Sequence, residues 1–522
     1  MSVETVRRIF VVALALAGLV AGGATGRAAI VPPPVGEAPG SSSPEVAAID
    51  AGAGLRALLE RRAAAFVAAF NAPGDDPLLA FARDHLETRL TSEGPATRFV
   101  EAMAAQRATL GRLDRHLPQI LRDGRLLFVV VQSARSGAWF NFQFRVHPED
   151  GNRLQLVFVS QDVEPVARPQ TPIEAPATRA WLDRYVELLG RQRPFSGVAL
   201  VVEGGRELWS TVQGVAVAEP PNATLPMTRA TRLNMASGSK LFTAVAVLQL
   251  VDDGKLTLDT RLAKLLPDFP NRDWAAQVTV RQLLTHTAGA GDYWDDEYEK
   301  SWGAITATAE MLPHVLRHVG STPVGDYSYS NSGYIVLGLV AERITGKSYY
   351  DLVQERIFAR AGMKATGFPL RSRAGADVAR PYRPEYDAGA VRIGSYVPVT
   401  LGERGTAAGG AVSTVDDLVA FVRALANGTL LRPATFREMI SEQVSQGAQG
   451  LAHGLGPILE TEGTVTSWGH GGTARGTQFE LRVYPARDLV AIVMSNYDTV
   501  AGYELAQAID DIVRASPVMP AP

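Results

Sequence analysis

Apolar and polar positions follow two different periods in the first third of the chain. Apolar residues recur at helical spacing over 55–70, and two further helices are predicted, one from Asp75-Asp76-Pro77 through Leu86 and one over 96–105. The period then changes to two. This alternation predicts three strands, over 126–131, 138–146 and 154–159. Helices followed by an antiparallel sheet indicate a small α+β domain over residues 47–166.

The remaining two thirds mix both periods again and predict a second, larger domain. A Pro-rich linker over 167–177 is expected to precede it, and the domain is placed at 178–516. Its expected elements are a helix over 179–192, strands over 196–202 and 207–215, strands over 477–484 and 489–495, and a final helix over 501–514. The chain is thus an α+β multidomain protein, and the order of helices and strands in its first domain resembles the NTF2-like cone.

Residues 1–29 carry the pattern of an export signal. Arg7 and Arg8 precede an apolar run of about 16 residues, and small residues follow through Ala29. A spanning helix needs about 20 residues, so a cleaved signal peptide is predicted, with an uncleaved anchor as the alternative. A Pro/Gly/Ser linker over 30–46 follows. We therefore expect a periplasmic or secreted protein with no stable membrane span after signal removal.

Composition excludes several classes of function. The formal net charge is -3 over 522 residues, which gives no support for a nucleic-acid partner. The chain has no cysteine, so disulfides, thiol catalysis and cysteine-ligated metals are excluded. His314 and His318 have the spacing of a metal-binding pair on a helix, but no third ligand is near them in sequence. An ordinary exposed helix is the favoured interpretation.

One apolar helix, predicted over 239–253, begins with a segment that carries candidate chemistry. Ser237 and Lys240 are three residues apart, which places both side chains on one face. A serine hydroxyl needs a base within hydrogen-bond reach, and a lysine becomes that base only when burial or nearby positive charge lowers its pKa. The N–H groups and positive potential of a helix N-terminus also suit a developing oxyanion.

Two downstream segments contain possible partners for this pair. Tyr329-Ser330-Asn331 precedes an apolar helix over 335–344, and it supplies a phenol that can accept a proton and an amide that can meet a substrate carbonyl. The segment from Trp468 to Thr473, which contains His470 and Gly472, is predicted to precede two strands, with the Thr473 N–H as a second oxyanion donor. Each segment alone also fits a surface turn or a solvated loop.

The order S-x-x-K, Y-x-N and H-x-G resembles the serine β-lactamase/penicillin-binding superfamily, in the branch of class C β-lactamases, D-alanyl-D-alanine carboxypeptidases and family VIII esterases. Three further stretches match it, 252–256, 283–289 and 408–414. The resemblance covers about two thirds of the chain, residues 178–515. It implies a three-layer β-lactamase/transpeptidase-like α/β domain, with an antiparallel sheet built near 196–215 and 454–495 and a helical insertion carrying Tyr329.

The resemblance also implies roles for individual residues and no cofactor or metal. Ser237 becomes the acylated nucleophile, Lys240 its proton partner, and Tyr329 a general base that also helps to activate water. Which of Lys240 and Tyr329 takes the first proton is left open. Candidate substrate-binding residues are Asn331, His470, Gly472, Thr473 and Arg475.

His470 stands where typical class C β-lactamases have a lysine. A histidine is mostly neutral at pH 7, so a weaker grip on a substrate carboxylate is expected, which favours esters or amides over β-lactams. Arg475 is a candidate to restore the missing charge. The expected function is a secreted serine hydrolase acting on small-molecule or peptide substrates: esters, amides or D-amino-acid peptides. The alternatives are a β-lactamase, or a penicillin-recognising sensor with little turnover.

Two neighbouring segments complete the expectations. His286 is assigned a structural role, because the resemblance gives it no proton-transfer step. The acidic aromatic loop over 292–298 is either a solvated surface or part of the substrate cleft, and the cleft is favoured because long polar loops on such scaffolds carry specificity. The oligomeric state is left open.

Overall fold

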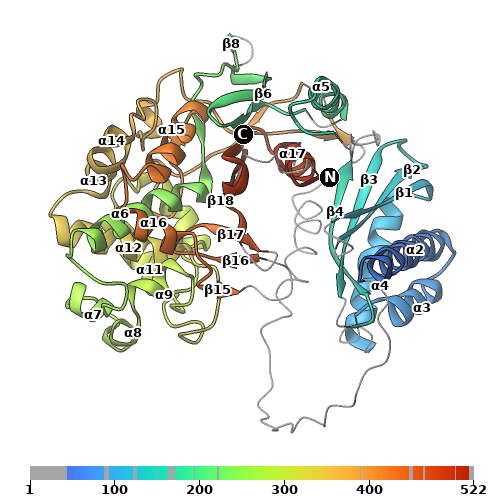
Figure 1. Cartoon of the computed structure of the whole chain (residues 1–522), viewed down its shortest axis with the longest axis horizontal. Helices are drawn as coiled ribbons and strands as arrows, with labels where there is room; N and C mark the ends of the chain where they lie inside the picture. The colour runs from blue at the N-terminus through green and yellow to red at the C-terminus, as the bar shows by residue number, and fades with distance from the viewer. Residues whose placement is uncertain are drawn as a thin grey trace, which may run out of the picture. The chain divides into compact units, whose positions relative to one another are not determined.

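The chain folds as two units, Met1–Ala167 and Arg168–Pro522, each with its own hydrophobic core (Figure 1). The computed structural model describes residues 44–87, 93–121, 126–147, 150–162, 171–192, 194–219, 223–387, 390–392, 394–445, 451–461, 465–499 and 501–515. The predicted signal peptide and most of the linker after it lie outside the described residues. Among the helices that are described, none is long and apolar enough to cross a membrane.

The first unit packs three helices against a four-stranded antiparallel sheet of order β1-β2-β3-β4. Its elements are α2 (Pro44–Asn71), α3 (Asp76–His85), α4 (Glu93–Leu110), β1 (Leu113–Leu121), β2 (Leu126–Ser133), β3 (Trp139–His147) and β4 (Arg153–Asp162). Phe66 joins helices to sheet, since its ring centroid lies 4.9 Å from that of Phe142 and 5.1 Å from that of Phe144. The likeness to an NTF2-like cone stays a prediction.

Strand β1 was not predicted, and its position explains why. Its sequence contains Pro118 and a run of polar residues instead of a clean alternation. Proline removes a backbone donor and is therefore confined to edge strands. Because β1 pairs only with β2, at the edge of the sheet, the proline is tolerated there.

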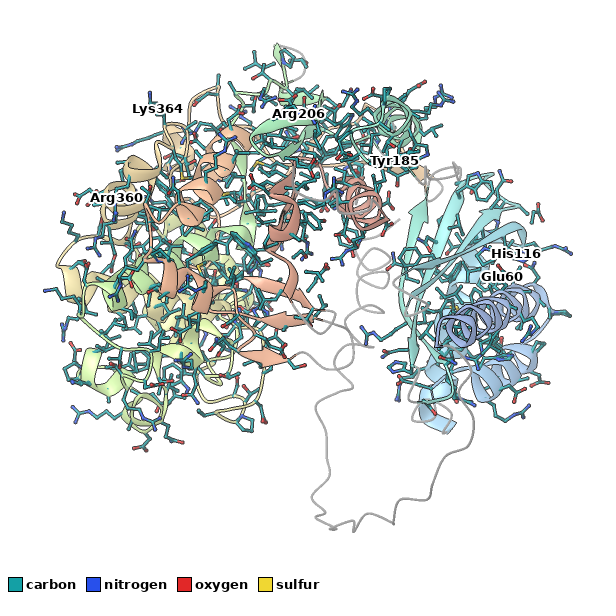
Figure 2. The ribbon with its side chains drawn as sticks, in the orientation of Figure 1. Glu60, His116, Tyr185, Arg206, Arg360 and Lys364 are labelled. Atoms are coloured by element: carbon teal, nitrogen blue, oxygen red, sulfur yellow. The ribbon has the colours of Figure 1, made fainter. Side chains whose placement is uncertain are left out.

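The second unit is built on an eight-stranded antiparallel sheet of order β15-β16-β17-β18-β19-β20-β5-β6. Its strands are β5 (Gly197–Glu203), β6 (Arg206–Gln213), β15 (Val444–Ser445), β16 (Leu451–His453), β17 (Ile458–Thr461), β18 (Val465–Ala474), β19 (Thr477–Tyr484) and β20 (Leu489–Ser495). The first helix, α5 (Pro176–Gln192), begins within the stretch predicted as a linker. Charged side chains such as Arg206, Arg360 and Lys364 lie on the outside of this unit (Figure 2).

Helices cover both faces of this sheet and make three layers. Successive strand residues point to opposite faces. Leu481 and Ile492 join the core that contains helix α6 (Lys240–Asp252), while Arg482 and Val493 lie with Ile509 of helix α17 (Ala501–Ala515). This three-layer arrangement with an antiparallel sheet agrees with the fold that the resemblance implies.

Helix α6 is the centre of the core, and every residue from Lys240 to Leu250 is buried. A helix that is apolar on all sides is stable only when surrounded. Phe242 illustrates this, because its ring meets those of Phe358 and Phe421 edge-on, each at 5.0 Å. The helices around it come mainly from residues 262–361, which include α12 (Asn331–Thr345) and carry Tyr329 at their edge.

Candidate active site

The nucleophile candidate Ser237 lies on a short turn, η4 (Ala236–Ser239), that leads into α6. Ala236 has a φ of 43°, which is uncommon for a residue with a side chain. Hydrogen bonds hold it there: its N–H donates to Asn234 Oδ1 at 2.7 Å, and its carbonyl accepts from Ser239 Oγ at 2.9 Å. Ser239 Oγ in turn accepts from the Ala411 N–H at 2.9 Å. The turn is therefore fixed before any substrate arrives.

Lys240 is completely buried, and its amine faces three oxygen atoms. Nζ lies 3.1 Å from Ser237 Oγ, 2.6 Å from Asn331 Oδ1 and 2.6 Å from the Ala408 carbonyl oxygen. Burial lowers the pKa of this amine to about 7, although the nearby Asp292 opposes the shift. Carbonyl oxygens only accept hydrogen bonds. A neutral amine that donates to Asn331 and Ala408 therefore directs its lone pair at Ser237.

Asp292 fixes which way the Asn331 side chain points. Its carboxylate accepts a hydrogen bond from Asn331 Nδ2 at 2.9 Å. Because a carboxylate offers no donor, the amide nitrogen must face Asp292 and the amide oxygen must face Lys240. Asn331 begins α12, where the preceding Ser330 caps the helix by accepting from the Gly333 N–H at 2.9 Å. The loop that carries Asp292 was favoured as part of the cleft, but Asp292 itself was not predicted.

Tyr329 brings its hydroxyl to the same serine. It is hydrogen-bonded to the Ser237 side chain, and desolvation, the larger effect, raises the pKa of the phenol above its usual value of 10, although the residue as a whole stays 36% exposed. Its ring stacks on the buried His286 with centroids 4.4 Å apart, and His286 Nδ1 accepts from the Ser330 N–H at 3.0 Å. His286 thus contacts Tyr329 and accepts a hydrogen bond from the next residue, and its structural role stays a prediction.

Three buried histidines surround this centre. Burial lowers the pKa of His470 to about 3 and of His453 to about 4, and the positive charge of Lys240 contributes next in both. The pKa of His286 is likewise held well below its usual value, mainly by burial. His453 Nε2 lies 3.0 Å from Tyr327 Oη, and its ring lies 5.0 Å from that of His286. All three are neutral at physiological pH, so Lys240 is the group there that changes charge near pH 7.

The segment from Trp468 to Thr473 precedes strands β19 and β20, as predicted, but it also lies inside a strand of its own, β18, which its residues did not predict. Its glycines are unusual in a strand, which is why the sequence pattern does not predict one here. They also allow the backbone of β18 to approach another backbone closely. A Cβ on Gly472 would lie 2.4 Å from the Met235 carbonyl oxygen and 3.0 Å from the Ser237 nitrogen. Only glycine allows β18 to approach the nucleophile turn so closely.

Strand register determines where the Thr473 N–H points. Residues 475 and 476 close the hairpin between β18 and β19, so Ala474 and Thr477 form the pair next to the turn and Thr473 pairs with Gln478. Antiparallel pairs alternate between hydrogen-bonded and non-bonded, beginning with a bonded pair at a two-residue turn. The Thr473 N–H is thereby directed away from β19, toward the side where pairing with β17 ends at Gly469.

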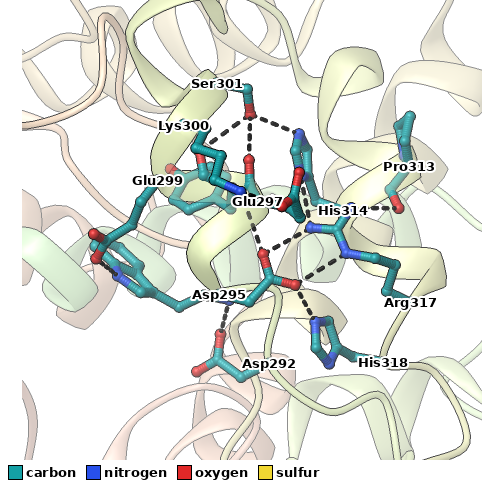
Figure 3. A network of polar contacts seen from close by, with 12 residues as sticks. Asp292, Asp295, Glu297, Glu299, Lys300, Ser301, Pro313, His314, Arg317 and His318 are labelled. Atoms are coloured by element: carbon teal, nitrogen blue, oxygen red, sulfur yellow. Dashed lines mark hydrogen bonds and ion pairs between the residues drawn. The ribbon is translucent and has the colours of Figure 1, made fainter.

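Arg475 and the pair His314 and His318 all contact other side chains near the site. Arg475 donates to Glu299 at 2.8 Å, and its guanidinium carbon lies 5.2 Å from the centre of the Trp302 ring, so its charge already has a partner. His318 Nε2 lies 2.8 Å from Asp295, which also binds Arg317 (Figure 3). The described residues contain no group of three or more potential ligands placed to hold a metal ion.

The family is decided by a match over most of the second unit. A family model described as Beta-lactamase matches residues 182–514. The chain belongs to the beta-lactamase family. This confirms the resemblance to the serine β-lactamase/penicillin-binding superfamily that the three motifs indicated.

Proteins with several named activities are similar to this family member. It is 28% identical to Penicillin-binding protein 4* of Bacillus subtilis over 63% of the chain and 74% of the relative. It is 29% identical to Esterase EstB of Burkholderia gladioli over 58% of the chain and 85% of the relative. A solved penicillin binding protein from Bacillus halodurans is 29% identical, with a TM-score of 0.54 over 60% of this chain and 96% of that one.

The structure thus brings most of the predicted site residues together around the serine, with His470 buried beside them. These residues are Ser237, Lys240, Tyr329, Asn331, Gly472 and Thr473. Sequence reasoning missed three contributors: Asp292, His453 and the Ala408 carbonyl. Ala408 begins a stretch that matched the superfamily, so its proximity was signalled but not its contact with Lys240. Nothing in the sequence distinguished His453 from a surface histidine.

Proposed function

We propose that the protein is a serine hydrolase that forms an acyl intermediate on Ser237 and transfers the acyl group to water. One observation carries the proposal: the buried Lys240 amine lies 3.1 Å from Ser237 Oγ while two acceptor oxygens occupy its other positions. A nucleophilic serine needs such a neighbouring base.

The relative proton affinities favour Lys240 as the first acceptor. With a pKa of about 7, the amine is half neutral at pH 7, whereas the raised pKa of the Tyr329 phenol keeps that group protonated. Oγ attacks the substrate carbonyl as its proton moves to Lys240, and the new oxyanion is held by the N–H groups of Ser237 and Thr473. The leaving group then departs with a proton delivered through Tyr329. In deacylation the same steps run in reverse. Water takes the place of the leaving group, its proton passes through Tyr329 to Lys240, and Ser237 Oγ leaves with that proton.

The substrate class follows from the charge of the site. His470 is neutral, so it grips a carboxylate weakly, and esters, amides or D-amino-acid peptides are preferred, with Asn331 meeting the substrate carbonyl. Relatives named as an esterase and as a D-aminopeptidase of Cereibacter sphaeroides, which is 29% identical over 61% of this chain and 60% of its own length, support this choice. A β-lactamase, or a penicillin-recognising protein with little turnover, is the alternative that the penicillin-binding relatives support.

Intact-mass spectrometry after exposure to esters, D-Ala-D-Ala peptides and penicillins tests the proposal. We expect an acyl adduct on Ser237 that turns over with p-nitrophenyl butyrate, and no adduct or turnover in Ser237→Ala. Wild-type activity of Ser237→Ala on every hydrolysed substrate would refute the mechanism. A kcat/KM for nitrocefin above that for the ester would favour the β-lactamase, and a penicillin adduct without turnover would favour the sensor.

We also propose export of the protein from the cell, on the basis of Arg7, Arg8 and the apolar run that follows them. N-terminal sequencing of the mature protein from periplasmic and culture fractions tests this. A start near residue 30 is expected. An intact N-terminus in the membrane fraction would instead indicate the uncleaved anchor.

A further inference from the structure

Exposed aromatic side chains gather at the active site. Large apolar side chains that remain exposed among the described residues include Trp294, Tyr327 and Tyr329. Tyr329 contacts Ser237, and Tyr327 contacts the buried His453. Trp294 is more exposed than either, at 42% against 36%. An exposed tryptophan beside a catalytic centre is a surface on which an apolar part of a substrate can stack.

Trp294 is attached to the catalytic amide through one carboxylate. Its backbone N–H donates to Asp292 Oδ1 at 3.1 Å, while Oδ2 of the same group accepts from Asn331 at 2.9 Å. The indole ring meets Tyr298 and Trp302 edge-on, with centroids at 5.3 and 5.7 Å. The first contact ties the Trp294 backbone to the carboxylate that orients Asn331, and the ring contacts hold the indole against Tyr298 and Trp302.

Glu299 joins this aromatic group to the opposite side of the site. Its Oε1 accepts from the Trp294 indole N–H at 3.1 Å and from Arg475 at 2.8 Å. Trp294 and Glu299 come from the helical part, whereas Arg475 comes from the turn of the β18–β19 hairpin, two residues after Thr473. Figure 3 shows Glu299 and Asp292 in the network of polar contacts around Asp295. The Glu299 carboxylate therefore links Trp294, on the helical side, to the β18–β19 turn, and it neutralises the charge of Arg475.

We propose that Trp294, Glu299 and Arg475 form a specificity wall, which accepts an uncharged apolar or aromatic substrate arm and disfavours an arm with a free carboxylate. Trp294 supplies the apolar face. Glu299 is already paired with the Arg475 guanidinium, which would otherwise attract a carboxylate of the substrate. The negative charge of Glu299 also repels such a carboxylate. This deepens the proposed function and rests on it.

Three esters, one uncharged and two with a carboxylate in different positions, test the wall. The wild type and Glu299→Gln are compared on p-nitrophenyl butyrate, on the p-nitrophenyl monoester of succinic acid, and on the butyrate ester of 4-hydroxybenzoate, which place the carboxylate on the acyl or on the leaving arm. Glutamine keeps the shape and removes the charge, which frees Arg475. We expect kcat/KM for at least one carboxylated ester, relative to butyrate, to rise about tenfold, equivalent to about 1.4 kcal/mol.

Two further variants make the result specific to the wall. Glu297→Gln is the matched control, because Glu297 lies on the same short helix and pairs with Lys300 at 2.5 Å instead of with Arg475. Its substrate ratios are expected to match those of the wild type. Glu299→Gln combined with Arg475→Gln is expected to lose the gain. Unchanged ratios in Glu299→Gln, or the same change in Glu297→Gln, would overturn the wall.

Trp294→Ala tests the apolar face separately. We expect its kcat/KM to fall about tenfold more for p-nitrophenyl phenylacetate than for p-nitrophenyl acetate, since only the phenylacetyl ring can stack on the indole. An equal fall for both esters would contradict the proposal. Failure of the wall leaves the acyl adduct on Ser237 in place, whereas failure of the proposed function removes the adduct itself, so the two outcomes are distinguishable.

Discussion

Two basic side chains, Lys240 and Arg475, have opposite environments in the structure. Lys240 is buried among neutral carbonyl and hydroxyl oxygens, and burial lowers its pKa to about 7. The Arg475 side chain is 51% exposed and is paired with the Glu299 carboxylate at 2.8 Å. Burial disfavours a charge, whereas solvent and a counter-charge retain it. In the proposed mechanism, the Lys240 amine must lose its charge to accept a proton. In the proposed wall, Arg475 keeps its charge, but that charge is paired with Glu299.

The same contrast predicts where substitutions matter. At Lys240 each partner is fixed by others, since Asn331 is held by Asp292, and Ser237 sits on a turn stabilised by Ser239 and Asn234. Removing one member leaves buried groups without partners, which is costly. At Arg475 water can replace a lost partner, so effects there are expected to be smaller and to depend on the substrate.

The largest effect is expected from Lys240→Ala. The serine loses its proton acceptor, and kcat should fall about 10³-fold or more. Single-turnover kinetics with p-nitrophenyl butyrate measures this fall. Lys255→Ala is the control, because Lys255 is exposed just beyond the end of α6. Equal activity of the two variants would contradict the proton role of Lys240.

A smaller but still large effect is expected from Gly472→Ala. The added Cβ would lie 2.4 Å from the Met235 carbonyl oxygen, so β18 would have to move away from the nucleophile turn. Misplacement of about 1 Å costs about 10²-fold in rate, and we expect that loss in kcat. Gly303→Ala is the matched control, because a Cβ there has nothing within 4 Å. A Gly472→Ala enzyme with wild-type kcat would show that the close approach is unimportant.

How much of this could be predicted from sequence depends on the kind of contact. Ser237 and Lys240 share one helical face, so their meeting is local and readable. Tyr329 and Asn331 lie about ninety residues away and could be joined to them only through the resemblance. The Ala408 carbonyl could not be predicted, since every residue has one and only the fold decides which faces Lys240. Strand β18 was not predicted from its own residues, because its glycines have low strand propensity and are needed where the strand approaches the nucleophile turn.

The third prediction concerns the pH profile and Asp292. Lys240 must be neutral to accept a proton, so kcat/KM should rise with pH through about 7, with protonated and inactive Lys240 below it. Asp292 raises the pKa of Lys240, and Asp292→Asn removes that effect. We expect the acid limb to move to lower pH and kcat to fall about tenfold, since the Asn331 amide loses its fixed orientation. An acid limb that stays in place would refute the link between Asp292 and Lys240.

The smallest effect is expected from Asp295→Ala, on the exposed side. Asp295 caps the short helix α10 (Asp296–Ser301) by accepting from the Tyr298 N–H at 2.8 Å, and it binds Arg317 and His318. The hydrogen bond from Arg317 is the largest cause of the lowered pKa of this carboxyl. The contribution of Asp295 to folding stability is therefore present above about pH 4 and is lost as the pH falls through the lowered pKa. We expect a slightly lower melting temperature and a change of roughly threefold or less in kcat/KM for p-nitrophenyl butyrate. Because exposed ion pairs are screened, added salt should shrink the difference from the wild type. A loss as large as that of Asp292→Asn would show that the exposed side is as tightly coupled to catalysis as the buried one.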